Sequence, residues 1–258
     1  MNAPHTIHAE AAVEAIARGL LASLPLSWTR AADPDEADAV AIAGDTGWAA
    51  HAASLIHGGV RRVVVTDPRQ DDPAAVRALA HLVASERAVV LLSEPYAGNP
   101  GLTDLPARLA DHQTVAIEAL GPRSAADLLF DQLRLARALG IADLALDYLA
   151  IDDRSASAVL RGRQAADPVH LRLLAASTRA GVPQLIVRAY GMASILTATV
   201  FDATTSRPTT ISGSTADAGS VEPTRYENAH RATWRALLTA TTSSDLIGFA
   251  EDVELLTS

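Results

Sequence analysis

The sequence predicts an α/β protein in two parts. The first is a parallel sheet covered by helices, and the second is an α+β region with an open, mostly antiparallel sheet. Two observations lead to this prediction. In the first half, short apolar runs alternate with helical segments in a β-α-β-α-β order, which is typical of buried parallel strands. In the second half, Thr- and Val-rich runs follow one another between turns, which favours antiparallel strands. We place the two domains at residues 1–119 and 120–258.

In the first half, each element is predicted from its spacing and its end signals. Ile7, Val13 and Ile16 lie close to helical spacing, and Asp72-Pro73 has the form of a helix cap followed by proline. The predicted helices cover residues 7–23, 47–58 and 73–86, and the predicted strands cover 26–31, 38–43, 60–66 and 88–93.

The second half begins with a predicted helix at 123–139 and continues with strand-like runs. The runs cover residues 144–151, 156–163, 169–175, 184–190 and 194–202. Residues 203–224 are rich in Thr, Ser and Gly, and we predict a long loop there. Helices are expected again at 225–241 and 245–256. In the first of these, Tyr226, His230 and Trp234 form a row that we interpret as interface or core, with a ligand-facing role as the alternative.

Composition excludes several classes of function. The 258 residues carry a formal net charge of −9, which argues against nucleic acid or an anionic membrane as partner. The absence of cysteine excludes disulfides and Cys-ligated metals. His51 and His57 lie six residues apart on one predicted helix and do not share a face, so we expect no metal site. The amino-terminal segment lacks the basic region of a secretory signal, and no apolar run is long enough to span a bilayer. We therefore expect a cytoplasmic protein with a small-molecule ligand.

Several segments resemble one enzyme family. Residues 38–68 read DAVAIAGDTGWAAHAASLIHGGVRRVVVTDP, residues 93–100 read SEPYAGNP, and residues 126–140 read ADLLFDQLRLARALG. In order and spacing these segments resemble the Gfo/Idh/MocA oxidoreductases. The resemblance implies a Rossmann-like domain followed by the family's α+β domain. It also implies a truncated first domain, in which the first strand, glycine loop, first helix and second strand are missing.

The resemblance points to a catalytic centre that has changed. The family ends its second conserved strand with Glu-Lys-Pro, whereas this sequence has Thr66-Asp67-Pro68 and no lysine at all, since its 21 basic residues are all Arg. The family's catalytic His lies on the helix that corresponds to residues 126–140, and Asp131 takes its position in this sequence. One interpretation is a rewired pair of acids, Asp67 and Asp131, that share a proton near Tyr96. The other is that the acids are solvated remnants of a lost site.

A dinucleotide site is not expected. The sequence has no Gly-x-Gly-x-x-Gly, and its nearest substitute is Gly44-Asp45-Thr46-Gly47, in which Asp45 would repel a phosphate. Gly44, Thr46 and Gly47 are therefore weak cofactor candidates, and the plainer interpretation is a loop after a strand.

Three parts of the family's machinery are missing together: the glycine loop, the Lys and the His. We therefore predict a degenerate, non-redox protein, either a partner subunit or a small-molecule-binding protein, without NAD(P). By the resemblance, its C-terminal sheet forms a homodimer or a heterodimer with a full-length paralogue. The alternative is an NAD(P)-dependent, imine-type reductase with Tyr96 as acid and an atypical or partner-completed cofactor site. A weaker likeness to the thiazolinyl imine reductases, which serve siderophore synthesis, suggests specialised metabolism for that alternative.

Overall fold

The chain divides into two compact units. The computed structural model describes residues 5–24, 27–205 and 207–257. One unit runs up to Gly98 and includes Ala229–Thr257, and the other is Asn99–Asn228. The sequence-based boundary between residues 119 and 120 falls inside a strand of the second unit, His112–Gly121.

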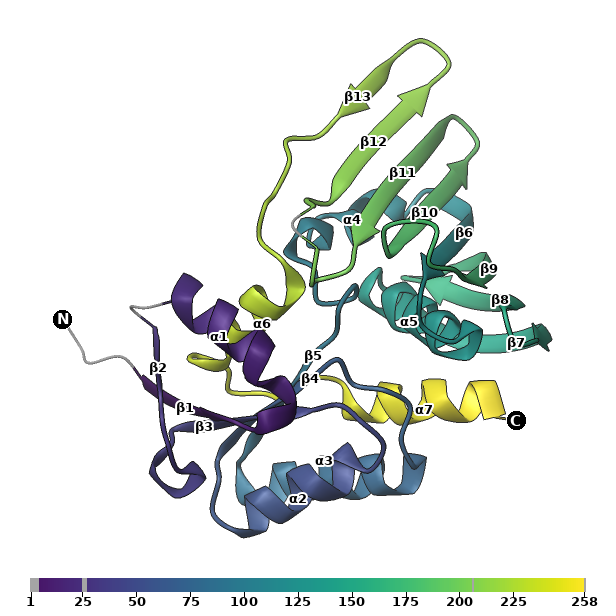
Figure 1. Ribbon diagram of the computed structural model, residues 1–258. Coiled ribbons are helices and arrows are strands. Elements are labelled where there is room, and N and C mark those ends of the chain that lie inside the picture. The colour runs from purple at the N-terminus through teal and green to yellow at the C-terminus, as the bar shows by residue number, and fades with distance from the viewer. Residues whose placement is uncertain (1–4, 25–26, 206, 258) are drawn as a thin grey trace. The chain divides into compact units, whose positions relative to one another are not determined.

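The first unit contains a five-stranded parallel sheet, which confirms the predicted Rossmann-like architecture. Its strands pair in the order β2-β1-β3-β4-β5 (Figure 1). They are β1 (His5–Ala9), β2 (Trp28–Arg30), β3 (Ala39–Ala43), β4 (Arg62–Thr66) and β5 (Val89–Ser93). Strands β3, β4 and β5 are almost wholly buried, as continuous apolar strands between two helical layers should be.

Helices cover both faces of this sheet. On one face lie α1 (Glu14–Ser23) and α6 (Ala229–Leu237), which share one apolar core with β1 and β3. There the Trp28 indole N–H donates to the Trp234 carbonyl at 2.9 Å. The other face is covered by α2 (Trp48–His57), α3 (Pro73–Glu86) and α7 (Leu246–Thr257). The ring of Trp48 meets that of Phe249 edge-on at 5.4 Å between centroids.

The amino-terminal prediction was wrong in two respects. Residues 7–23 were expected to be one helix, but His5–Ala9 form β1, Ala11–Val13 a 3₁₀ turn, and only Glu14–Ser23 the helix. A first strand, first helix and second strand are therefore present, whereas the resemblance had suggested that they were missing. The cause is the short length of β1. Five residues are too few to show a strand period, so the apolar side chains before and after the turn merge into one helical spacing.

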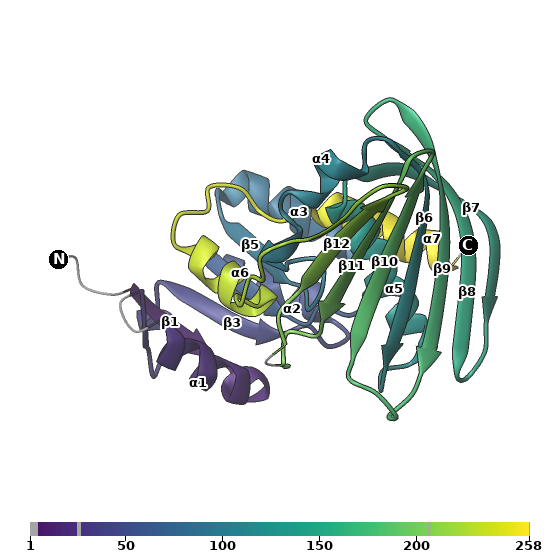
Figure 2. The same ribbon diagram turned by 90° about the horizontal axis from the view of Figure 1, so that it is seen from above.

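The second unit is built on an eight-stranded sheet with helices on one face (Figure 2). The strand order is β13-β12-β11-β10-β6-β9-β8-β7, and every pair except β6–β9 is antiparallel, as predicted. The strands are β6 (His112–Gly121), β7 (Ile141–Ile151), β8 (Ser155–Gln164), β9 (Asp167–Ser177), β10 (Gln184–Gly191), β11 (Ser194–Phe201), β12 (Thr210–Thr215) and β13 (Gly219–Val221). The helices α4 (Leu105–Leu109) and α5 (Ala125–Ala138) belong to the same unit.

Two carboxy-terminal predictions need correction. Residues 203–224 were expected to be a loop, but they contain β12 and β13. These edge strands are polar, with only Ile211 buried, so they lack the alternation that marks a strand in a sequence. The helix expected at 225–241 is shorter, Ala229–Leu237. In the row that the sequence suggested there, His230 and Trp234 are buried and Tyr226 is 82% exposed.

Candidate functional site

The strand order places a topological switch point between β1 and β3. From β1 the chain crosses through α1 to β2 on one side, whereas from β3 it crosses through α2 to β4 on the other. In open parallel sheets, ligands bind beyond the carboxyl ends of the two strands at such a point. The turn after β1 and the loop after β3 are therefore the first places to look for a dinucleotide site.

The turn after β1 does not have the form of a phosphate site. It reads Glu10-Ala11-Ala12-Val13, and the first glycine of the chain is Gly19, inside α1. The Glu10 carboxylate contacts the His51 imidazole of α2, with Oε1 and Nε2 2.6 Å apart. Glu14 adds a second carboxylate in the first turn of α1. Two acids thus stand at the helix end where a pyrophosphate would need free amides and positive potential.

The loop after β3 is held by backbone contacts and has no glycine cradle. Gly44 N–H donates to the Thr66 carbonyl at 2.7 Å, and Arg69 N–H donates to the Gly44 carbonyl at 2.8 Å. A Cβ on Gly44 would lie 2.3 Å from the Pro68 Cα. Gly44 is therefore required by the close approach of two loops, which is the plainer of the two interpretations given above.

The amino terminus of α2 is already occupied by a carboxylate of the chain. Asp71, which is 9% exposed, accepts hydrogen bonds from the amides of Gly47 and Ala49, both at 2.9 Å. A third amide, that of Asp72, donates to the same side chain at 3.0 Å. The amides at Gly47 that would serve a phosphate are thus satisfied internally. The residues at the switch point do not fit the phosphates of a dinucleotide.

A second cluster lies at the carboxyl ends of β4 and β5. The Ser93 hydroxyl is 2.8 Å from His230 Nδ1, and His230 Nε2 is 3.3 Å from Asp67 Oδ1. His230 Nε2 and Asp67 Oδ1 are both buried. They are close enough for an ion pair, but their geometry is not that of a hydrogen bond. Ser93 and His230 are buried, whereas the Asp67 side chain is 39% exposed. Asp67 also has a positive φ of 52°, an unusual conformation for a residue other than glycine.

This arrangement is able to hold a proton near the surface of the first unit. When Nδ1 of a neutral His230 accepts from the Ser93 hydroxyl, the ring proton lies on Nε2, 3.3 Å from the Asp67 carboxylate but outside hydrogen-bond geometry. Asp67 is then the solvent-accessible member and His230 its buried partner. Sequence reasoning named Asp67 and His230 separately but did not bring them together. Ser93 was missed, although it is the last residue of a predicted strand, where side chains reach the sheet edge.

The other predicted catalytic residues have different surroundings. Tyr96 is only 1% exposed and belongs to the first unit. Asp131 belongs to the second unit, where its two carboxylate oxygens accept from Arg123 at 3.0 and 2.7 Å. Arg123 thus gives this carboxylate a charged hydrogen-bond partner within its own unit. Asp127 donates its backbone N–H to Ser124 and forms part of the amino-terminal cap of α5.

Across residues 5–24, 27–205 and 207–257, no group of three or more His, Cys, Asp or Glu side chains is arranged to hold a metal ion. Among the same residues, no helix is both long and apolar enough to cross a bilayer.

The solved structures that share this fold are oxidoreductases of the Gfo/Idh/MocA type, which confirms the predicted fold. A 3-ketoreductase from Actinomadura kijaniata, solved with TDP-benzene and NADP, matches with a TM-score of 0.80 at 14% identity, over 99% of this chain and 97% of that one. An oxidoreductase from Sinorhizobium meliloti matches with a TM-score of 0.77 at 13% identity, over 100% and 96%. A UDP-N-acetylglucosamine 3-dehydrogenase from Acidithiobacillus ferrooxidans matches with a TM-score of 0.73 at 14% identity, over 100% and 96%. At such identities the likeness concerns the fold. No family model and no curated protein sequence matches the chain.

Proposed function

We propose that this chain is a non-redox derivative of the dehydrogenase fold, which binds a small molecule and works as a subunit of an assembly without holding NAD(P) itself. One observation carries the proposal. At the switch point of the sheet, the Glu10 carboxylate contacts His51 where a dinucleotide would place its pyrophosphate. At the neighbouring helix end, the Asp71 carboxylate accepts from the amides of Gly47 and Ala49. Glu10 therefore disfavours a phosphate through charge repulsion, and Asp71 takes up amides that a phosphate would need.

The direct test is a calorimetric titration of the full-length protein with NADPH and NADH. We expect a dissociation constant weaker than about 0.1 mM, which corresponds to less than roughly 5 kcal/mol of binding. Glu10→Gln removes the charge and keeps the length of the side chain, so any residual affinity should rise relative to wild type. Glu36→Gln, an exposed acid of the same unit, serves as the matched control and should change nothing. Binding tighter than 0.1 mM by the wild type would overturn the proposal.

A second candidate function is an NADP-dependent reductase. Arg30 is the last residue of β2, where an Arg is able to accept the 2′-phosphate of NADP. The ketoreductase that shares this fold was solved with NADP. However, Arg30 Nη1 already contacts Glu14 at 2.8 Å, and Tyr96, the proposed acid, is buried. If turnover with NADPH is found, Tyr96→Phe and Asp67→Asn should each lower the rate by about 100-fold or more, as expected for a positioned acid.

We also propose that the open sheet of the second unit packs against another subunit, in a homodimer or with a paralogue. Along β9, buried residues alternate with exposed ones, so one face of the sheet is left open. That face carries Tyr148, Leu174 and Tyr190, which are 55%, 54% and 41% exposed. Large exposed apolar side chains on one face are typical of association surfaces. Arg188 and Glu118, paired on the same face, add a polar component.

Light scattering at micromolar concentration tests the assembly. We expect at least a dimer, and we expect Tyr148→Arg with Leu174→Arg to shift it toward monomer, because two charges would be buried in the interface. The control is Tyr226→Arg, since Tyr226 is 82% exposed and lies outside the sheet. A wild-type monomer without a co-purifying partner would contradict this proposal.

A further inference from the structure

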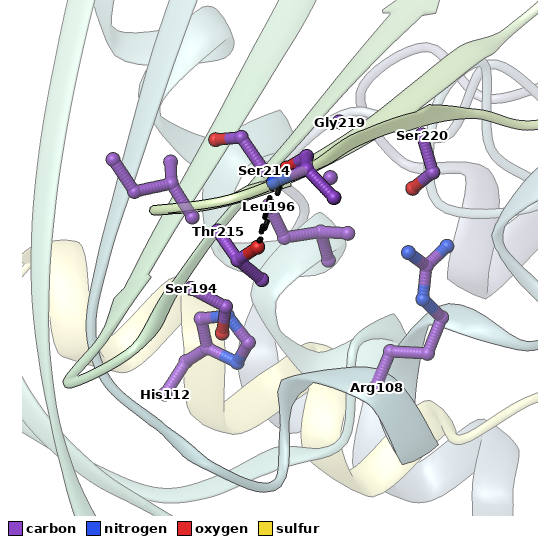
Figure 3. Close-up of a pocket in the computed structure, with 11 residues that line it drawn as sticks. Arg108, His112, Ser194, Leu196, Ser214, Thr215, Gly219 and Ser220 are labelled. Carbon is purple, nitrogen blue, oxygen red and sulfur yellow. Dashed lines mark hydrogen bonds between the residues drawn. The ribbon is translucent and has the colours of Figure 1, made fainter.

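The second unit contains a pocket of about 370 Å³ that is separate from the residues discussed so far. It lies between α4, the first residue of β6, the start of β11 and the β12–β13 hairpin. Figure 3 shows the guanidinium of Arg108 facing Ser220 at one side and His112 beneath Ser194 at the other. A volume of this size suits a small organic ligand.

Arg108 is the one permanently charged side chain among the described residues that line this pocket. Its partner, Glu222, follows β13 and contacts the guanidinium from the rim. The Arg108 side chain therefore already binds a carboxylate that the chain itself supplies. A planar guanidinium is the side chain best matched to a carboxylate, since it offers two parallel donors.

Gly213 keeps a space open beside this guanidinium. A Cβ at this position would lie 3.2 Å from the Ser220 hydroxyl and 3.4 Å from Arg108 Nη2. Gly213 does not have a positive φ, so its backbone conformation does not require glycine. The missing side chain instead leaves room where a ligand atom can receive hydrogen bonds from both groups. Within the described chain, the Ser214 and Ser220 hydroxyls make no hydrogen bond and remain available for a ligand.

A buried histidine also lines this pocket. His112 is 6% exposed, and its Nε2 lies 3.3 Å from the Ser194 hydroxyl. Its other ring nitrogen, Nδ1, is buried without a hydrogen-bond partner. Buried polar atoms of this kind are rare because they lose their hydration without compensation. The adjacent Leu196 is buried and gives the lining an apolar part.

We propose that this pocket binds a small organic monocarboxylate. The ligand carboxylate replaces Glu222 on Arg108 and accepts from Ser220, while its carbon atoms lie against Leu196. The single positive charge of Arg108 favours a ligand with one negative charge. The single charge of Arg108 is balanced by Glu222, so a second carboxylate is accommodated when Glu222 turns away, whereas a phosphate carries nearly two charges. This inference does not depend on the nucleotide proposal, because every lining residue belongs to the second unit.

Nuclear magnetic resonance of the full-length protein tests the pocket with propionate, lactate and inorganic phosphate as probes. The signals to follow are the Arg108 Nε–H and the His112 imidazole. Propionate and lactate should shift both signals, and phosphate should not. Arg108→Gln should weaken carboxylate binding roughly tenfold or more, because it removes charge-assisted hydrogen bonds. Glu222→Gln should strengthen it, because it removes the internal competitor.

Two further variants separate the site from general effects. Gly213→Val fills the space beside the guanidinium and should abolish binding in a protein whose circular dichroism is unchanged. Asp147→Asn removes an acid that is also paired with an arginine, Arg161, but does not line the pocket, and its carboxylate affinity should equal that of wild type. The proposal is wrong if no probe shifts the two signals, if phosphate binds more tightly than the carboxylates, or if Glu222→Gln fails to raise the affinity.

Discussion

Three acidic side chains of the two units differ in the partners that they bind. In the first unit, Glu10 contacts an imidazole and Asp71 accepts from backbone amides, at two helix ends where anions often bind in this kind of fold. In the second unit, Asp131 pairs with Arg123. Glu10 and Asp71 thus contact donors that an anion could use, whereas Asp131 balances the charge of a guanidinium. The difference teaches that a shared fold need not share its ligand-binding positions, because a few carboxylates decide which donors stay available.

Removing a buried acid of the second unit should have the largest effect. Asp131 is 6% exposed and the Arg123 side chain 19% exposed. Asp131→Ala leaves a charged guanidinium without this partner, so we expect a loss of about 3–5 kcal/mol in the free energy of unfolding, measured with urea. Asp127→Asn, on the same helix but in its exposed cap, should cost less than about 1 kcal/mol. Equal losses in the two variants would mean that Asp131 has no special structural role and would reopen a catalytic one.

Removing Asp71, an acid that accepts hydrogen bonds from amides, should lower the free energy of unfolding by less than removing Asp131 does. Asp71→Ala leaves the amides of Gly47 and Ala49 to water, and the loss of such a helix cap costs about 1–2 kcal/mol. Asp45→Ala is the matched control, because its side chain is 74% exposed and the change should stay within about 0.5 kcal/mol. If Asp71→Ala were neutral in urea unfolding, the helix end would not depend on its carboxylate, and the contrast between the units would weaken.

The sequence predicted the fold better than the site, for physical reasons. Helix α3 was predicted at its observed limits, because Asp72-Pro73 is a strong local start signal. The short strand β1 and the polar edge strands β12 and β13 were missed, since neither had room or burial enough to show a period of two. Their positions depend on tertiary pairing, which a local pattern does not encode.

The site was harder to predict because its contacts are distant in sequence. Asp67 and His230 are separated by more than half of the chain, yet they belong to one cluster. Asp71 follows a predicted strand by a few residues, but only the structure shows that its partners are the amides of a helix that precedes it. Sequence reasoning selected residues by the chemistry of their side chains. It did not identify which of these side chains would be paired with other groups of the same chain.

The smallest expected effect is on the pH dependence of stability. It involves one exposed acid in each unit, Asp38 in the first and Asp152 in the second. In the first, the amide of Thr6 donates to Asp38 at 2.8 Å and lowers the pKa of that carboxyl below its usual value of 3.8. In the second, the amides of Arg154 and Ser155 similarly lower the pKa of Asp152. A depressed pKa in the folded state gives stability that is present above pH 3.8 and is lost as the pH falls through the folded pKa.

Because Asp38 is half exposed, its contribution after solvent screening should be about 0.5 kcal/mol or less. Asp38→Asn should therefore flatten the acid limb of stability slightly, and its cost in unfolding free energy should shrink as the pH falls below 3.8, as measured by urea unfolding between pH 3 and 7. A loss of equal size at every pH would show that the Asp38 contact acts through geometry and not through charge.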